Sequence, residues 1–294
     1  MQYGFSIKRK CYLLSVLLMT VWLTGCVQEE FESTPSPAGN GIRFTLTVPD
    51  VNLPSVSSRT MTGTGTAKKE DEIETVDILV FDMSKTPAVF LEWVSATGVT
   101  QDLADNSTVS FSAVLSPTTA STCIVVVANK ELDNIVSGFT KGATTKVEAM
   151  EKMLHTQTGK WLADGSTTGG YTRIPMYGEK VISKITPSMN PITEINMKRM
   201  LARIDIRNNS VTSNFMVEEV YLANYNTTGY IAPAWNTNGQ VTEPAPDTPV
   251  LPTGSGKMTE EGNAILYSVN GNTPYDGEIY TFESLAAGDA GGAG

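Results

Sequence analysis

The chain offers few side chains for catalysis. His155 is its single histidine, so a zinc site with several histidine ligands is excluded and one residue is left for any Ser-His arrangement. Its surroundings predict a helix end, where an imidazolium can cap the last carbonyl groups. Asp102 and Asp105 lie in a polar loop without a third oxygen ligand at calcium-loop spacing. Residues 63–65 (Gly-Thr-Gly) lack the Gly-Lys-Ser/Thr ending of a phosphate loop. We therefore expect no enzyme, no metal and no cofactor.

Tryptophan side chains could instead form a flat platform for sugars. Trp93, Trp161 and Trp235 lie far apart in the sequence, and packing in a core or at its rim is the favoured explanation of all three. A monomeric surface protein that binds glycans through Trp161 or Trp235 therefore stays open as an alternative function.

The remaining chemistry is lipid attachment to Cys26. Residues 8–10 (Lys-Arg-Lys) are basic and the following 13 residues, 11–23, are apolar, which is typical of a secretory signal and too short for a membrane helix. Leu-Thr-Gly precedes Cys26, which is similar to the bacterial lipobox, whose cysteine is lipidated and becomes the mature N-terminus. A second acyl chain, such as palmitate, makes such an anchor stable. An ordinary signal peptide with a chance cysteine is the alternative.

Two acidic residues, Glu29 and Glu30, closely follow Cys26. They are similar to the export signal of surface lipoproteins in gut and oral anaerobes, although a solvated linker would also be acidic. Together with Cys26 they predict a protein tethered to the outer membrane and exposed at the cell surface.

Composition limits the remaining function classes. The chain has 294 residues and a formal net charge of −10. Removal of residues 1–25, which hold three basic and no acidic side chains, makes the net charge −13. Such a surface repels phosphates, so we expect no nucleic-acid partner. Without the signal and Cys26, Cys123 is the last cysteine, so no intrachain disulfide is possible and packing must supply the stability.

The elements that must position any site are mainly strands. Residues 42–48 alternate strictly, which places Ile42, Phe44, Leu46 and Val48 on one face. Further strands are predicted at residues 75–81, 88–94, 108–115, 122–128, 195–207, 215–223, 264–269 and 278–282. Short helices are predicted at residues 131–137 and 144–154. In the long strand 195–207, the pattern places Met200, Ala202, Ile204 and Ile206 on one face, with Leu201 as an apolar exception. Residues 75–81 are apolar enough to be covered on both faces.

Several stretches in order resemble the type V pilins, the fimbrillin or major fimbrial subunit family. After the lipobox and the first alternating strand come a loop with Arg59 and the acidic lead-in to a strand at residues 72–81. Residues 125–129 resemble the family's Val-Val-x-Ala-Asn strand end. Residues 197–204 resemble its Lys-Arg-x-x-Ala-Arg strand, and residues 279–283 its late Tyr-x-x-Glu stretch.

The resemblance implies a fold and a route to function. It implies two transthyretin-like, Greek-key β-sandwich domains in a subunit that polymerises into a fimbrium and supports adhesion. In the family, an Arg-specific protease cuts after an arginine beyond the first strand, and Arg59–Thr60 matches that bond. The cut would remove the strand with Ile42, Phe44, Leu46 and Val48, and a strand from another pilin subunit would take its place.

The expected organisation follows from these assignments. It comprises a signal peptide (residues 1–25), a lipidated tether (26–41), a cleavable pro-segment (42–59), a first sandwich (60–190) and a second sandwich (191–294). Family members continue with further strands where residues 286–294 are Gly/Ala filler, so the second sandwich is expected to be incomplete. A tip, accessory or anchor subunit that keeps its lipid is therefore an alternative to a shaft subunit. A host glycan or protein could be its ligand.

Overall fold

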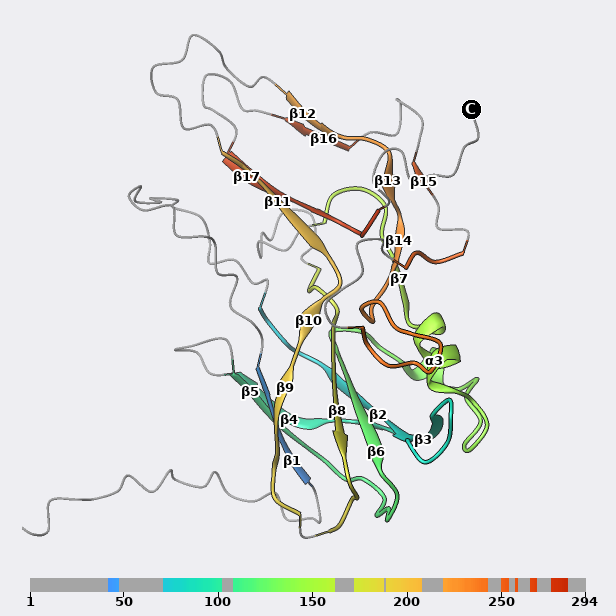
Figure 1. Ribbon diagram of the computed structural model, residues 1–294. Coiled ribbons are helices and arrows are strands. Elements are labelled where there is room, and N and C mark those ends of the chain that lie inside the picture. The colour runs from blue at the N-terminus through green and yellow to red at the C-terminus, as the bar shows by residue number, and fades with distance from the viewer. Residues whose placement is uncertain are drawn as a thin grey trace, which may run out of the picture. The chain divides into compact units, whose positions relative to one another are not determined.

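The computed structural model describes the part of the chain downstream of the expected tether. The described residues are 42–47, 71–101, 108–161, 172–187, 189–207, 219–242, 250–253, 257–258, 265–268 and 276–284. All of them belong to the compact unit Gly41–Gly294 (Figure 1). Cys26, Val48, Arg59, Thr60, Asp102, Asp105 and residues 63–65 lie outside this description.

The described chain is mainly β, as predicted. Its strands are β1 (Ile42–Thr47), β2 (Val76–Asp82), β3 (Val89–Ser95), β4 (Thr97–Gln101), β5 (Thr108–Ala113), β6 (Thr122–Ala128), β7 (Leu154–Thr156), β8 (Met176–Ile182), β9 (Ile192–Asn196), β10 (Lys198–Arg199), β11 (Ala202–Arg207), β12 (Glu219–Leu222), β13 (Tyr225–Asn226), β14 (Thr228–Tyr230), β15 (Lys257–Met258), β16 (Ile265–Ser268) and β17 (Asp276–Thr281). Two short helices are α2 (Asp133–Val136) and α3 (Lys146–Lys152).

Two sheets face each other across one apolar core. The first has the strand order β4-β5-β1-β9 and the second the order β10-β8-β6-β2-β3. Alternate side chains of both sheets, among them Phe44, Phe111, Ile78 and Val126, form a single buried cluster. Burying one face of each sheet against the other is the stable solution for amphipathic strands. This confirms the predicted β-sandwich class.

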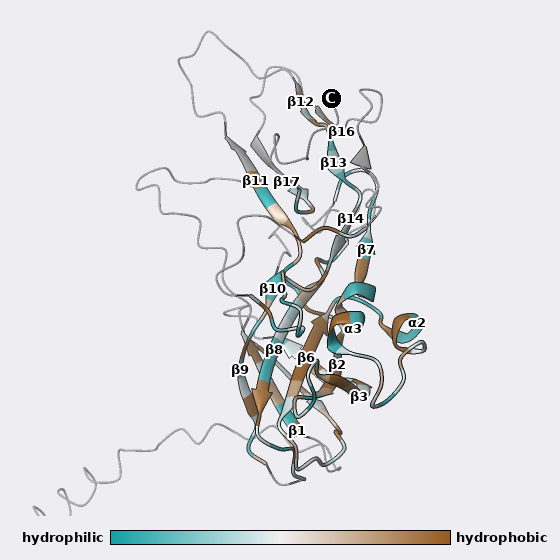
Figure 2. Cartoon of the chain, turned by 45° about the vertical axis from the view of Figure 1, so that its right-hand side comes forward, coloured by the Kyte–Doolittle hydropathy of each residue, from teal (hydrophilic) through white to brown (hydrophobic). Residues whose placement is uncertain are grey.

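The two central strands of the second sheet are buried on both faces. All described side chains of β6 are buried, as are those of β2 up to Phe81. On the face away from β1, Leu79 and Val125 pack against Ala149 and Met150 of α3. Figure 2 shows the hydrophobic residues concentrated on β6, β3 and the helices. The prediction that residues 75–81 are covered on both sides is therefore confirmed.

Helix α3 begins at a complete capping box. The Thr145 side chain accepts a hydrogen bond from the Glu148 amide, and the Glu148 carboxylate accepts one from the Thr145 amide. These bonds satisfy donors that would otherwise have no partner at the helix start. They also hold the pKa of Glu148 below its usual range.

Strand β8 is not among the predicted strands. Its sequence, Met-Tyr-Gly-Glu-Lys-Val-Ile, mixes a glycine and charged residues with apolar ones and shows no clean period. Gly178 is needed because a Cβ there would lie 2.6 Å from Sδ of Met197 and 2.9 Å from a methyl carbon of Ile195. The close approach of Ile195 and Met197 therefore explains why a glycine is needed at this position, which the sequence pattern did not indicate.

The predicted long strand 195–207 is divided in the structure into the end of β9, then β10 and β11. The irregular residues Met200 and Leu201 shift the alternation between strands β10 and β11. As a result Ala202 and Ile204 are exposed, whereas Leu201 packs against the core beneath α3. The prediction that Met200, Ala202 and Ile204 share one face is wrong, because the break between β10 and β11 separates buried Met200 from exposed Ala202 and Ile204.

The later strands form pairs: β11-β17, β12-β16, β13-β15 and β14-β7. Tyr225, Ile265 and Ile279 form a small separate core. Met200, Ile231 and Phe282 join the larger cluster beneath α3. The expected domain boundary near residue 190 stays a prediction.

Candidate assembly site: strand β1 and its groove

Strand β1 lies inside its sheet rather than at an edge. It pairs antiparallel with β5, where Phe44 lies opposite Phe111, and parallel with β9, where Phe44 lies opposite Ile192 (Figure 1). The amide of Met197 extends the parallel ladder by donating to the Thr47 carbonyl at 2.9 Å. Both partner strands are remote in sequence, so tertiary pairing alone determines this position.

The face of β1 predicted to be apolar is buried in the sandwich core. Ile42, Phe44 and Leu46 are 4%, 1% and 0% exposed. The ring of Phe44 is stacked on that of Phe111, with centroids 5.0 Å apart and an interplanar angle of 6°. Thr47, on the opposite face, is exposed. The strict alternation in the sequence is thus a core-facing pattern, as predicted.

These contacts give β1 a large share of the sandwich's stability. Full burial of one such side chain contributes about 1.5–3 kcal/mol, so the three together contribute roughly 5–9 kcal/mol. That is comparable to the whole stability of a typical domain, about 5–15 kcal/mol. Removing β1 would leave β5 and β9 two strand spacings apart, roughly 9–10 Å, with unpaired backbone groups on both walls. Only another strand placed between β5 and β9 would pair the backbone groups of both walls again.

Within the described residues, only noncovalent contacts hold β1 in place. The one described cysteine, Cys123, is a buried free thiol on β6. Burial raises its pKa to about 12, so the thiol stays protonated and unreactive. A single cleavage of the peptide chain between Thr47 and Asp71 would therefore leave β1 bound to the residues after the cut by noncovalent contacts alone.

His155 does not cap a helix, contrary to the sequence-based expectation. Helix α3 ends at Lys152, and His155 lies in β7 opposite Gly229. Its ring packs against Trp161 and Phe282, with centroids 4.9 Å and 6.4 Å away. Burial, helped by the positive charge of Lys130, lowers the pKa of His155 to about 4. Among the described residues neither ring nitrogen has a hydrogen-bond partner, so there His155 acts as a neutral packing residue.

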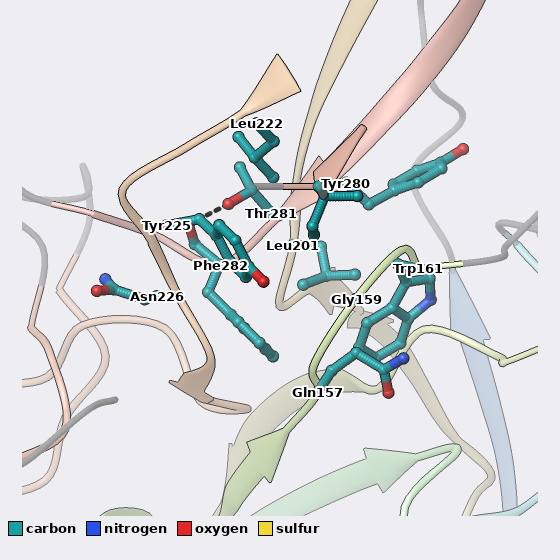
Figure 3. A pocket seen from close by; sticks show the side chains of 11 residues that line it. Gln157, Gly159, Trp161, Leu201, Leu222, Tyr225, Asn226, Tyr280, Thr281 and Phe282 are labelled. Atoms are coloured by element: carbon teal, nitrogen blue, oxygen red, sulfur yellow. Dashed lines mark hydrogen bonds between the residues drawn. The ribbon is translucent and has the colours of Figure 1, made fainter. Parts of the chain in front are cut away.

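Trp161 does not offer a sugar platform. Its side chain is 6% exposed, and its indole nitrogen donates to the Thr172 carbonyl at 2.9 Å. The adjoining pocket, lined by Leu201, Tyr280 and others, has a cavity volume of about 10 Å³ (Figure 3). That is room for about one water molecule. Trp235 packs edge-on against Tyr230, with ring centroids 4.9 Å apart.

Two further ionisable side chains among the described residues, Asp77 and Lys146, are buried. Lys146 forms an ion pair with Glu179 at 2.6 Å, and its side chain is 2% exposed. The Tyr177 hydroxyl donates to the same carboxylate oxygen at 2.5 Å. Among the described residues, no group of three or more His, Cys, Asp or Glu is placed to hold a metal ion, and no described helix is long and apolar enough to cross a membrane.

Comparison with known proteins finds one matching family model and several similar solved structures. Residues 42–246 match the family model described as "Major fimbrial subunit protein (FimA)". Two similar solved structures come from Parabacteroides distasonis. One, a proposed cell adhesion protein, is 17% identical, with a TM-score of 0.45 over 85% of this chain and 73% of its own. The other, a fimbrial assembly protein, is 12% identical, with a TM-score of 0.37 over 81% and 85%. A search of curated proteins finds no significant match.

Proposed function

Because its residues 42–246 match that family model, the chain belongs to the FimA major fimbrial subunit family, and we propose that it is a structural fimbrial subunit that assembles by exchange of strand β1. Residues 1–25 direct export, and Cys26 carries the lipid that holds the precursor at the outer membrane. An Arg-specific protease cuts Arg59–Thr60, and a strand from another pilin subunit fills the vacated groove. The polymer supports adhesion at the cell surface.

The position of β1 is the observation that carries this proposal. A strand at a sheet edge can be lost without opening the sheet, whereas β1 separates β5 from β9. Its loss would expose backbone donors and acceptors on two walls together with the apolar floor that contacted Ile42, Phe44 and Leu46. A donated strand with alternating apolar residues would satisfy both, since main-chain bonds supply affinity and the side-chain pockets set its register.

The mature N-terminus tests the order of events. Protein recovered from the cell surface is analysed by mass spectrometry, separately in monomer and polymer fractions. A start at Thr60 in the polymer and at lipidated Cys26 in the precursor is expected. A polymer that begins at Cys26 would contradict strand removal and would favour an anchor or accessory subunit.

Strand exchange is tested separately with a peptide. Purified chain is cut at Arg59 and its multimers are measured by size-exclusion chromatography with light scattering. Excess peptide of residues 41–48 should occupy the groove and suppress multimers. A control peptide in which Phe44 and Leu46 are replaced by serine should not. Equal effects of both peptides would refute exchange at this groove.

A monomeric glycan-binding lipoprotein is the alternative function. Burial of Trp161 leaves Trp235 as its candidate aromatic contact. Saccharide-dependent tryptophan fluorescence that disappears in Trp235→Phe, in a protein that keeps residues 26–59, would favour it.

A further inference from the structure

Residues 71–74, which end two positions before the start of strand β2 at Val76, are held by side chains from four separate parts of the chain. Residues 71–74 contact Gln101, Asn129, Arg173 and Arg199, which we call the 71–74 clamp. These residues are the first described ones after β1. The clamp therefore lies downstream of the expected pro-segment, at the first described residues of the expected first sandwich.

Gln101, the last residue of β4, bonds the backbone at two points. Its side-chain nitrogen donates to the Asp71 carbonyl at 2.7 Å, and its side-chain oxygen accepts from the Ile73 amide at 3.1 Å. The side-chain amide of Gln101 thus makes the two backbone hydrogen bonds that a neighbouring strand would otherwise make. Between these two bonds, the chain is fixed so that the Ile73 side chain, 5% exposed, enters the same core as β1.

Asn129 continues this pairing on the other side. Its side-chain nitrogen donates to the carbonyls of Glu72 at 2.8 Å and Ile174 at 3.0 Å. Its side-chain oxygen accepts from the Glu74 amide at 3.0 Å. The backbone of Asn129 has a φ of 58°, a left-handed conformation that asparagine tolerates better than most residues. That conformation ends β6 and directs the amide at residues 72–74.

Ion pairs reinforce the backbone bonds. Arg173 contacts the carboxylates of Glu72 at 3.3 Å and Glu74 at 2.7 Å. Arg199 is paired with the Asp71 carboxylate, and the Arg199 side chain is 15% exposed. The three acidic residues of the segment are therefore paired with two guanidinium groups from distant parts of the chain.

Three of the stretches that carry the family resemblance meet in this clamp. They are the acidic lead-in to β2, the asparagine at the end of β6, and the arginine of the Lys-Arg stretch. More than 50 residues separate each of these stretches from the next. None of the four clamp side chains lies on β1, so loss of β1 removes none of them directly.

From this geometry we propose that the 71–74 clamp keeps strand β2 and the floor of the β1 groove in place after the cut. The inference rests on the proposed function, because it concerns the chain after β1 has been cut away. A cut leaves a new free end close to β2, and free ends fray. If β2 frayed, Ile73 and then Val76 would leave the core and the groove would lose its floor. The clamp holds residue 71 onward in place, so fraying from the new N-terminus stops there and the groove stays open for a donated strand.

The test compares intact and cut full-length chain. A site for a sequence-specific protease is placed between residues 55 and 65, and cleavage releases the β1 side without relying on Arg59. Backbone hydrogen exchange of Ile73 and Glu74 is measured by mass spectrometry, and the N-terminus that survives proteinase K is mapped. The variants are Asn129→Ala and the milder Gln101→Ala. Asn134→Ala, at an exposed residue of α2, is the matched control.

Protection of Ile73 and Glu74 should persist in cut wild-type and Asn134→Ala chains, and proteinase K should stop near residue 71. Loss of the Asn129 bonds should speed exchange at Glu74 about 10- to 100-fold, since about 1.4 kcal/mol corresponds to a factor of ten. In the cut chain, Asn129→Ala should also allow trimming past Val76, whereas the intact variant should not be trimmed there. Gln101→Ala should show a smaller effect of the same kind.

Two results would refute the proposed role of the 71–74 clamp. One is a cut wild-type chain that loses protection at residues 73–74 or is trimmed into β2. The other is an Asn129→Ala effect equal in cut and intact chains, which is expected of a merely structural residue. Failure of strand exchange is distinguishable, because it appears as a cut chain that stays monomeric while residues 73–74 remain protected.

Discussion

Replacement of Phe44 by alanine gives the most direct test of how β1 is held. The Phe44 ring is 1% exposed and stacked on Phe111 in the core. Truncation of a buried phenylalanine costs about 3–5 kcal/mol, because both transfer free energy and packing are lost. The change leaves the backbone ladder to β5 and β9 intact, so the loss is one of side-chain contact.

The expected loss can be read from urea unfolding of the intact chain. With a urea dependence of about 2 kcal/mol per M, the midpoint should fall by roughly 1.5–2.5 M. Thr47→Ala, at an exposed residue of the same strand, is the control and should change the free energy of unfolding by less than about 1 kcal/mol. After a cut between residues 47 and 71, the Phe44→Ala strand should also bind its groove roughly 150- to 4000-fold more weakly.

Either of two outcomes would refute this reasoning. A midpoint shift for Phe44→Ala no larger than for Thr47→Ala would mean that the β1 side chains do not contribute to the core. A large shift without faster release of the cut strand, measured by native mass spectrometry, would mean that β1 and its groove do not separate as one unit.

Three further predictions concern buried groups. Burial lowers the pKa of His155 to about 4 from an ordinary 6.5. The stability that neutral His155 contributes is therefore complete above about pH 6.5 and is lost as the pH falls toward 4. The difference in melting temperature between wild type and His155→Phe should vary with pH only over that range. Cys123 should not react with a maleimide in native protein at pH 8 but should react fully in denaturant, and native labelling would contradict its burial. Glu179→Ala should destabilise the chain by about 3–5 kcal/mol because Lys146 stays buried without its partner, whereas Lys146→Met with Glu179→Leu should recover most of that loss in urea unfolding.

Local sequence patterns were sufficient to predict burial where one strand or helix buries a whole face. The alternation of Ile42, Phe44 and Leu46, and the continuous apolar runs of β2 and β6, predict their burial correctly because period and hydrophobicity are properties of the segment itself. The helix in residues 144–154 is confirmed as the shorter α3, which its capping box begins. Lipid attachment at Cys26 and cleavage at Arg59 rest on sequence alone and stay predictions.

The tertiary structure decided what pairs with what. Nothing local to β1 indicates that it lies between an antiparallel β5 and a parallel β9, because ladder bonds join residues far apart in the chain. The mixed composition of β8 hides a strand whose glycine is explained only by the approach of Met197. His155 belongs to a strand because Gly229 lies opposite it. The sequence by itself determined which faces are apolar. Only long-range pairing and packing placed β1 between β5 and β9 and brought Asn129 and Arg199 to residues 71–74.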